Sequence, residues 1–180
     1  MKWNLPNSLT VARILIIPVF MWSFSQNPLL AMAIFLIAAI TDALDGHLAR
    51  KNNQVTTFGK FLDPIADKLL VFSALLLFVE VGQAPVWVAM LVIARELLVT
   101  GLRILAIDKK IIIPAGISGK VKTMVQIIAV LWMLSPLAYT NVDGNMITNY
   151  TNDIAVYAIL VVTLWSGIDY FYKFRKIFVD

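Results

Sequence analysis

The amino-acid sequence predicts an all-α integral membrane protein, a bundle of six transmembrane helices with both termini in the cytoplasm. Three observations lead to this fold class. Of the 180 residues, 60% are hydrophobic and 14% are charged, whereas soluble domains carry about 25% charged residues. The apolar residues gather in six long runs, and the basic residues gather at alternate ends of those runs. This composition excludes a soluble globular protein.

Each predicted helix is an apolar run of roughly 20 residues, the length that crosses a hydrocarbon core about 30 Å thick. In chain order, the breaks fall at Asn27-Pro28, between Arg50 and Lys60, from Gly82 to Pro85, from Lys109 to Gly119 and from Asn141 to Asn149. Turn residues or charges end each run there. No repeat or linker divides the chain, so residues 1–180 are expected to form a single domain. The predicted spans are Ser8 to Ser25, Pro28 to Ala49, Phe61 to Val79, Pro85 to Ile107, Lys120 to Tyr139, and Tyr150 to Phe171.

The basic residues predict the orientation, because Lys and Arg near helix ends stay on the cytoplasmic side. The connections around Asn27, around Gly82 and from Asn141 to Asn149 contain neither residue type. We therefore expect a multi-pass protein of the cytoplasmic membrane. The basic residues at the other connections and the termini are Lys2, Arg13, Arg50, Lys51, Lys60, Lys109, Lys110, Lys120, Lys122, Lys173, Arg175 and Lys176.

Charge and residue usage limit the chemistry. The net charge of +4 suggests anionic partners, which in so apolar a chain are membrane lipid headgroups or phosphates and not nucleic acid. The chain has no cysteine and a single histidine, His47, so thiol catalysis and zinc sites built on Cys or His are excluded. Any metal must be held by oxygen ligands.

Four aspartates form the main candidate site. Asp42 and Asp45 lie at the cytoplasmic end of the second predicted helix, and Asp63 and Asp67 at the start of the third. Spacings of three and four residues place the members of each pair on one helix face. Four converging carboxylates repel one another unless cations lie between them, and oxygen ligands select Mg²⁺ or Mn²⁺. Four carboxylates are enough for two such ions, on the cytoplasmic side.

Small residues and one arginine accompany these carboxylates. Gly46 and Ala49 follow Asp42 along its helix face, and Gly59 precedes Asp63 by one turn. They leave room for a ligand, although small residues also allow close helix packing in membranes. Arg50 is placed to meet an anionic group beside the metals.

The segment from Asp42 to Asp67 reads Asp-x-x-Asp-Gly-x-x-Ala-Arg, then eight residues, then Gly-x-x-x-Asp-x-x-x-Asp. This pattern resembles the signature of the CDP-alcohol phosphatidyltransferases at all eight specified positions. The resemblance implies a homodimer of six-helix subunits, a CDP-linked lipid donor and a two-metal site. It also implies that Asp67, besides binding metal, is the catalytic base. The residues implied in CDP-diacylglycerol binding within this pattern are Gly46, Ala49, Arg50 and Gly59.

The chain's opening, from Pro6 to Arg13, is similar to that of the family branch that uses glycerol 3-phosphate and to that of the related cardiolipin synthases. Asn7, Thr10 and Arg13 recur at three-residue steps in the first turns of the first helix, where free N–H groups favour anions. Contacts to the CDP-diacylglycerol pyrophosphate or nucleotide are expected. Capping by Asn7 and a membrane anchor at Arg13 are the alternatives.

Cations on the fourth and fifth helices form a second candidate set: Arg95, Arg103, Lys120 and Lys122. Resemblance to the same branch implies that they bind the phosphate of glycerol 3-phosphate. An internal ion pair with Glu96 is the alternative for Arg95, which lies too deep for easy snorkelling. Lys120 and Lys122 could instead be positive-inside anchors.

The reaction expected from the resemblance is transfer of a phosphatidyl group from CDP-diacylglycerol to glycerol 3-phosphate, which gives phosphatidylglycerophosphate and CMP. The nearest alternative is a sister transferase that uses phosphatidylglycerol, serine or an inositol phosphate as acceptor. An intramembrane prenyltransferase would need aspartates on two separated helix pairs. An ion transporter would need carboxylates near the midplane of broken helices.

Overall fold

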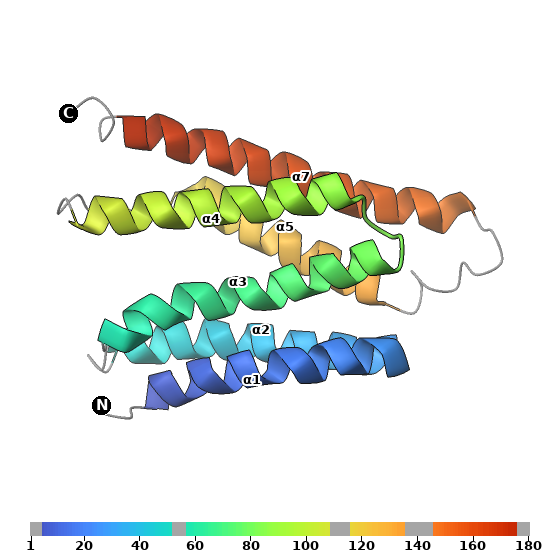
Figure 1. The fold of residues 1–180 in the computed structure, drawn as a ribbon, viewed down its shortest axis with the longest axis horizontal. Coiled ribbons are helices and arrows are strands. Elements are labelled where there is room, and N and C mark those ends of the chain that lie inside the picture. Colours follow the sequence, from blue (N-terminus) through green and yellow to red (C-terminus); the bar gives the residue numbers. More distant parts are fainter. Residues whose placement is uncertain (1–4, 52–56, 109–115, 136–145, 176–180) are drawn as a thin grey trace.

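A computed structural model describes residues 5–51, 57–108, 116–135 and 146–175. These residues are almost entirely helical, which confirms the predicted all-α class. The helices run roughly along one common axis (Figure 1). Their bounds are α1 (Leu5–Gln26), α2 (Pro28–Lys51), α3 (Thr57–Glu80), α4 (Val86–Asp108), α5 (Ile117–Leu134) and α7 (Met146–Phe174).

The helices pack as two connected groups. α1 packs against both α2 and α3, while α7 packs against α4 and α5. Contacts of α5 with α2 and α3, and of α3 with α4, join the groups. Because successive helices alternate in direction, the start of α1 and the end of α7 lie at the same end of the bundle (Figure 1). The ends of α2 and α4 and the starts of α3 and α5 lie there too, so the predicted basic connections share one side.

Aromatic side chains form part of the core between α1, α2 and α3. Phe20 and Phe35 are fully buried, with ring centroids 5.9 Å apart. Phe24 meets Phe78 edge to face at 6.2 Å. Such pairs contribute about 0.5–1.5 kcal/mol each beyond the burial of their area, so they help to fix how α1 lies against its two neighbours.

Two helix boundaries follow from local chemistry. The Asn27 side chain accepts a hydrogen bond from the Leu29 N–H at 2.9 Å, and Pro28 takes the first helical position, where its missing N–H costs nothing. After α3, Gly82 adopts φ +74°. The Gln83 N–H then donates to the Phe78 carbonyl at 2.8 Å, the hydrogen bond that closes a glycine-terminated helix.

The end of α5 differs from the predicted span. The helix stops at Leu134, and Ser135 is extended with φ −69° and ψ 149°, whereas the apolar run predicted a helix to Tyr139. Pro136 explains the difference, because a residue that precedes proline is disfavoured in the helical region. At other ends the helices are longer than predicted. α3 begins at Thr57 and not at Phe61, because a helix can continue through polar residues that a hydrophobic run excludes.

The side-chain distribution favours a lipid environment. Polar residues such as Arg95, Glu96 and Gln126 are buried, whereas large apolar residues such as Ile154 and Ile168 are exposed by 67% and 70%. Exposed apolar surface on this scale marks contact with a membrane or a partner. Among the described residues, two helical stretches are long and apolar enough to cross a membrane: Ile117–Leu134 and Tyr150–Lys173.

Candidate functional site

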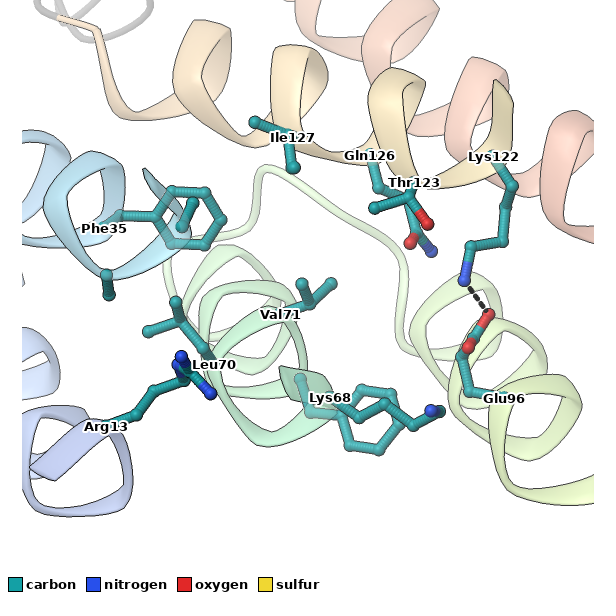
Figure 2. A pocket seen from close by; sticks show the side chains of 13 residues that line it. Arg13, Phe35, Lys68, Leu70, Val71, Glu96, Lys122, Thr123, Gln126 and Ile127 are labelled. Atoms are coloured by element: carbon teal, nitrogen blue, oxygen red, sulfur yellow. Dashed lines mark hydrogen bonds and ion pairs between the residues drawn. The ribbon is translucent and has the colours of Figure 1, made fainter. Parts of the chain in front are cut away.

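A cavity of about 200 Å³ lies inside the bundle. Four charged side chains from four different helices line it: Arg13 of α1, Lys68 of α3, Glu96 of α4 and Lys122 of α5 (Figure 2). The remaining lining residues are Phe35, Ala38, Ala39, Leu70, Val71, Phe72, Thr123, Gln126 and Ile127. Three cationic side chains and one carboxylate thus line one space among the described residues, and cations in an apolar space attract an anionic ligand more strongly than in water.

Glu96 pairs two of the cations on this side of the bundle. Its Oε1 lies 2.7 Å from Arg95 Nη1 and 2.6 Å from Lys122 Nζ. The three side chains are 6–10% exposed. A buried charge is strongly destabilising unless it is paired and hydrogen-bonded, and here Glu96 of α4 pairs with Lys122 of α5. The internal pair of Arg95 with Glu96, the alternative raised by the sequence, is present.

The predicted acceptor cations occupy different surroundings. Lys122 lines the cavity, whereas Arg95 does not. Arg95 contacts Glu96, and its Nη2 donates to Ser166 Oγ of α7 at 2.8 Å. Arg103 is exposed and donates to the Tyr170 hydroxyl at 2.7 Å. Lys120 is exposed and is not among the residues that line the cavity. The structure therefore brings Arg95 and Lys122 together and leaves Lys120 apart.

The predicted donor residues of α1 are placed in part. Thr10 and Arg13 are both buried, with exposures of 2% and 7%. Arg13 lines the same cavity as Lys122. Arg13, predicted to bind CDP-diacylglycerol, and Lys122, predicted to bind glycerol 3-phosphate, thus line the same cavity. The side chain of Asn7 lies outside the described part of the structure.

The aspartates are placed by their helices. Asp42 and Asp45 belong to the last ten residues of α2, and Asp63 and Asp67 to the first eleven of α3. Both segments lie at the same end of the bundle (Figure 1). The side chains of these four residues and of Arg50 lie outside the described part, as do the surroundings of Gly46, Ala49 and Gly59.

The cavity begins where these aspartates lie along the helices. Its α2 wall includes Ala39, three residues before Asp42, which is a rise of about 4.5 Å along the helix. Its α3 wall includes Lys68, the residue after Asp67. Along α2 and α3, the cavity therefore begins next to the helix segments that contain the aspartates.

The donor set of the predicted metal site consists of oxygen atoms alone, and the helices bring both aspartate pairs to one end of the bundle. These two features fit hard divalent cations such as Mg²⁺ or Mn²⁺. Among the side chains that the structure describes, no other group of three or more His, Asp or Glu residues could hold a metal.

Several contacts were not predicted from the sequence. Lys68 lines the cavity, and Arg95 contacts both Ser166 and the Tyr170 ring. Asp169 accepts hydrogen bonds from Ser118 and, at 2.6 Å, from Lys173. A signal existed for Lys68, a charged residue inside an apolar run. Ser166 carried none, because a serine in a membrane helix commonly bonds its own backbone.

Comparison with known proteins defines the class. Residues 3–165 match the family model of CDP-alcohol phosphatidyltransferases, and the chain belongs to this family. A CDP-diacylglycerol–glycerol-3-phosphate 3-phosphatidyltransferase of Bacillus subtilis is 41% identical over 95% of each chain. The enzyme of the same name from Rickettsia bellii is 38% identical over 97% of each chain. A probable phosphatidylglycerophosphate synthase of Mycobacterium tuberculosis is 40% identical over 93% of this chain and 79% of its own.

The ion-pair network generates a stability prediction. Glu96→Gln leaves Arg95 and Lys122 without their shared carboxylate, so the free energy of unfolding should fall by about 3–5 kcal/mol. Thermal unfolding in detergent measures this as a lower Tm. Asp153→Asn removes a carboxylate from an exposed position on α7 and should leave Tm nearly unchanged. An equal Tm for the two variants would contradict the assigned pairing.

Proposed function

We propose that this chain transfers the phosphatidyl group of CDP-diacylglycerol to glycerol 3-phosphate, giving phosphatidylglycerophosphate and CMP. The chain is then a transferase of phosphatidylglycerol biosynthesis. The observation that carries the proposal is a cavity lined by cations, next to helix segments that contain the complete family signature of eight positions. Family membership and the names of three relatives that align over most of the chain support the same substrates.

The proposed chemistry is a substitution at phosphorus. A hydroxyl oxygen of glycerol 3-phosphate attacks the phosphorus that carries the diacylglycerol, and a new P–O bond forms. The P–O bond to CMP breaks, and CMP leaves with the electron pair. The hydroxyl proton passes to the Asp67 carboxylate, which acts as general base. Arg13 and Lys122 lower the energy of the negative charge on the two substrates from opposite walls of the cavity.

The aspartates supply the metal site in this proposal. Asp42, Asp45, Asp63 and Asp67 would hold two divalent ions, Mg²⁺ or Mn²⁺. Bound divalent ions neutralise pyrophosphate charge and so favour departure of CMP. Asn7, Thr10, Arg13 and Arg50, with the small residues Gly46, Ala49 and Gly59, would form the donor site around them.

The proposed setting is the cytoplasmic membrane. A donor with two acyl chains enters from the bilayer, whereas glycerol 3-phosphate and CMP exchange with water. A single six-span domain over residues 1–180, with both termini and the aspartates at the cytoplasmic face, meets both requirements. The shared position of the basic residues supports this orientation. Membrane lipids would surround the bundle, and two subunits would form a homodimer.

A phosphorylated acceptor fits the cavity better than serine or phosphatidylglycerol. Arg13 and Lys122 line the cavity, and a phosphate monoester can accept charge-assisted hydrogen bonds from such cations, whereas the serine zwitterion carries no net negative charge. We place the acceptor phosphate beside Lys122, the member of the predicted acceptor set that lines the cavity. Family membership leaves no support for the ion-transporter and prenyltransferase alternatives.

The acceptor is tested by CMP release. Purified protein with CDP-diacylglycerol should release CMP with glycerol 3-phosphate at a kcat/KM at least about tenfold higher than with serine, phosphatidylglycerol or inositol phosphate, a difference of roughly 1.4 kcal/mol in transition-state binding. Preference for any other acceptor would identify a sister transferase instead.

Metal dependence is tested by chelation. EDTA should abolish CMP release, because carboxylates that converge without cations cannot bind a pyrophosphate. Added Mg²⁺ or Mn²⁺ should restore it, and Zn²⁺ should be less effective with an oxygen-only donor set. Undiminished turnover in chelator would remove the metal site from the proposal.

The base is tested by two matched amide variants. Asp67→Asn should lower kcat by roughly 10²–10⁴ while CDP-diacylglycerol binding stays within a few-fold. Asp42→Asn should instead weaken metal and donor binding together, because Asp42 is assigned to metal alone. If Asp67→Asn kept a near-normal kcat at saturating metal, the base would have to be another residue or a water molecule.

A further inference from the structure

α7 holds Arg95 of α4 from several sides. Arg95 Nη2 donates to Ser166 Oγ at 2.8 Å, and its Cζ lies 5.8 Å from the centroid of the Tyr170 ring. A Cβ added at Gly167 would lie only 3.1 Å from Arg95 Cγ, so the α7 backbone itself bounds the arginine. Few orientations of the guanidinium remain open to it.

The guanidinium that α7 holds is directed at Glu96 and not at the cavity. Nη1 bonds to Glu96 Oε1 at 2.7 Å, and Nη2 is occupied by Ser166. Nε lies 3.4 Å from the position of a Cβ on Gly167, which puts it against α7. Arg95 is also absent from the residues that line the cavity. The two hydrogen bonds of the guanidinium therefore go to Glu96 and Ser166 and not to the cavity.

Glu96 carries the constraint to the cavity. The same Oε1 atom that accepts from Arg95 accepts from Lys122 Nζ at 2.6 Å, and Figure 2 shows the two side chains meeting at the cavity wall. A lysine ammonium on a four-carbon stem has many rotamers. A fixed carboxylate removes most of them, so the location of the Lys122 charge depends on what fixes Glu96.

We infer that Arg95 and Ser166 are positioning residues that hold Glu96, and through it the Lys122 ammonium, where the phosphate of the acceptor binds. This inference rests on the proposed function for the identity of that acceptor. It gives Arg95 an indirect part in acceptor binding, in place of the direct phosphate contact that the sequence suggested. Ser166 lies just beyond residues 3–165 that match the family model, so this contact lies outside the segment matched to the whole family.

A double-mutant cycle on the KM for glycerol 3-phosphate tests the inference. Ser166→Ala should raise that KM by about threefold to tenfold, less than the full effect of a hydrogen bond to a charged group because the change reaches Lys122 indirectly, and leave the KM for CDP-diacylglycerol within twofold. In a Lys122→Met background, Ser166→Ala should have no further effect, because the group that it positions is gone. The matched control is Ser23→Ala, since Ser23 and Ser166 are both 0% exposed; it should change neither KM.

Inorganic phosphate supplies a readout that does not depend on turnover. Phosphate should raise the Tm of the wild-type protein, and Ser166→Ala should reduce that shift while Ser23→Ala preserves it. Additive effects of Ser166→Ala and Lys122→Met, or equal rises in both KM values, would overturn the inference in favour of a general packing role. If the wild type used another acceptor, the proposed function would fail, and the phosphate-dependent Tm would still decide the positioning: an unchanged shift in Ser166→Ala would overturn it.

Discussion

The pairing of buried charges at Glu96 is the constraint on which the rest of the site depends. In an apolar bundle an unpaired charge is strongly destabilising, so Arg95, Glu96 and Lys122 can be buried only together. The Lys122–Glu96 contact of 2.6 Å connects α5 to α4, while Arg95 contacts Glu96 at 2.7 Å within α4. The bond from Arg95 to Ser166 extends the network to α7. The contacts that pair these buried charges therefore also connect α4 with α5 and α7, and they fix the Lys122 charge at the cavity wall.

The cavity brings charged side chains from four helices to one space. Glu96 pairs with Lys122, and Arg13 and Lys68 line the wall from α1 and α3. In a low-dielectric space cations attract an anionic ligand more strongly than they do in water. An enzyme with two phosphate-bearing substrates can use these cations, because substrate binding and stabilisation of the transferring phosphoryl group then come from the same side chains.

The features that could be predicted from sequence are those repeated along the chain or confined to one segment. Six apolar runs and the alternation of basic residues predicted the helices and their shared end, because hydropathy and charge are local properties. The aspartate signature was also visible, since one segment of 26 residues contains it. Pro136 shows the limit even locally: its effect on Ser135 ended α5 at Leu134, although the apolar run continued.

The sequence by itself determined the helical class, the order of the helices and which charges are unusual enough to matter. Only the tertiary structure decided what those charges touch. Arg95 meets Ser166, 71 positions away, and Lys122 meets Glu96, 26 positions away. Such partners depend on how each helix is rotated about its axis, and that rotation is set by side-chain packing across helices. Helix periodicity along one segment contains no information on which face of a distant segment it will meet.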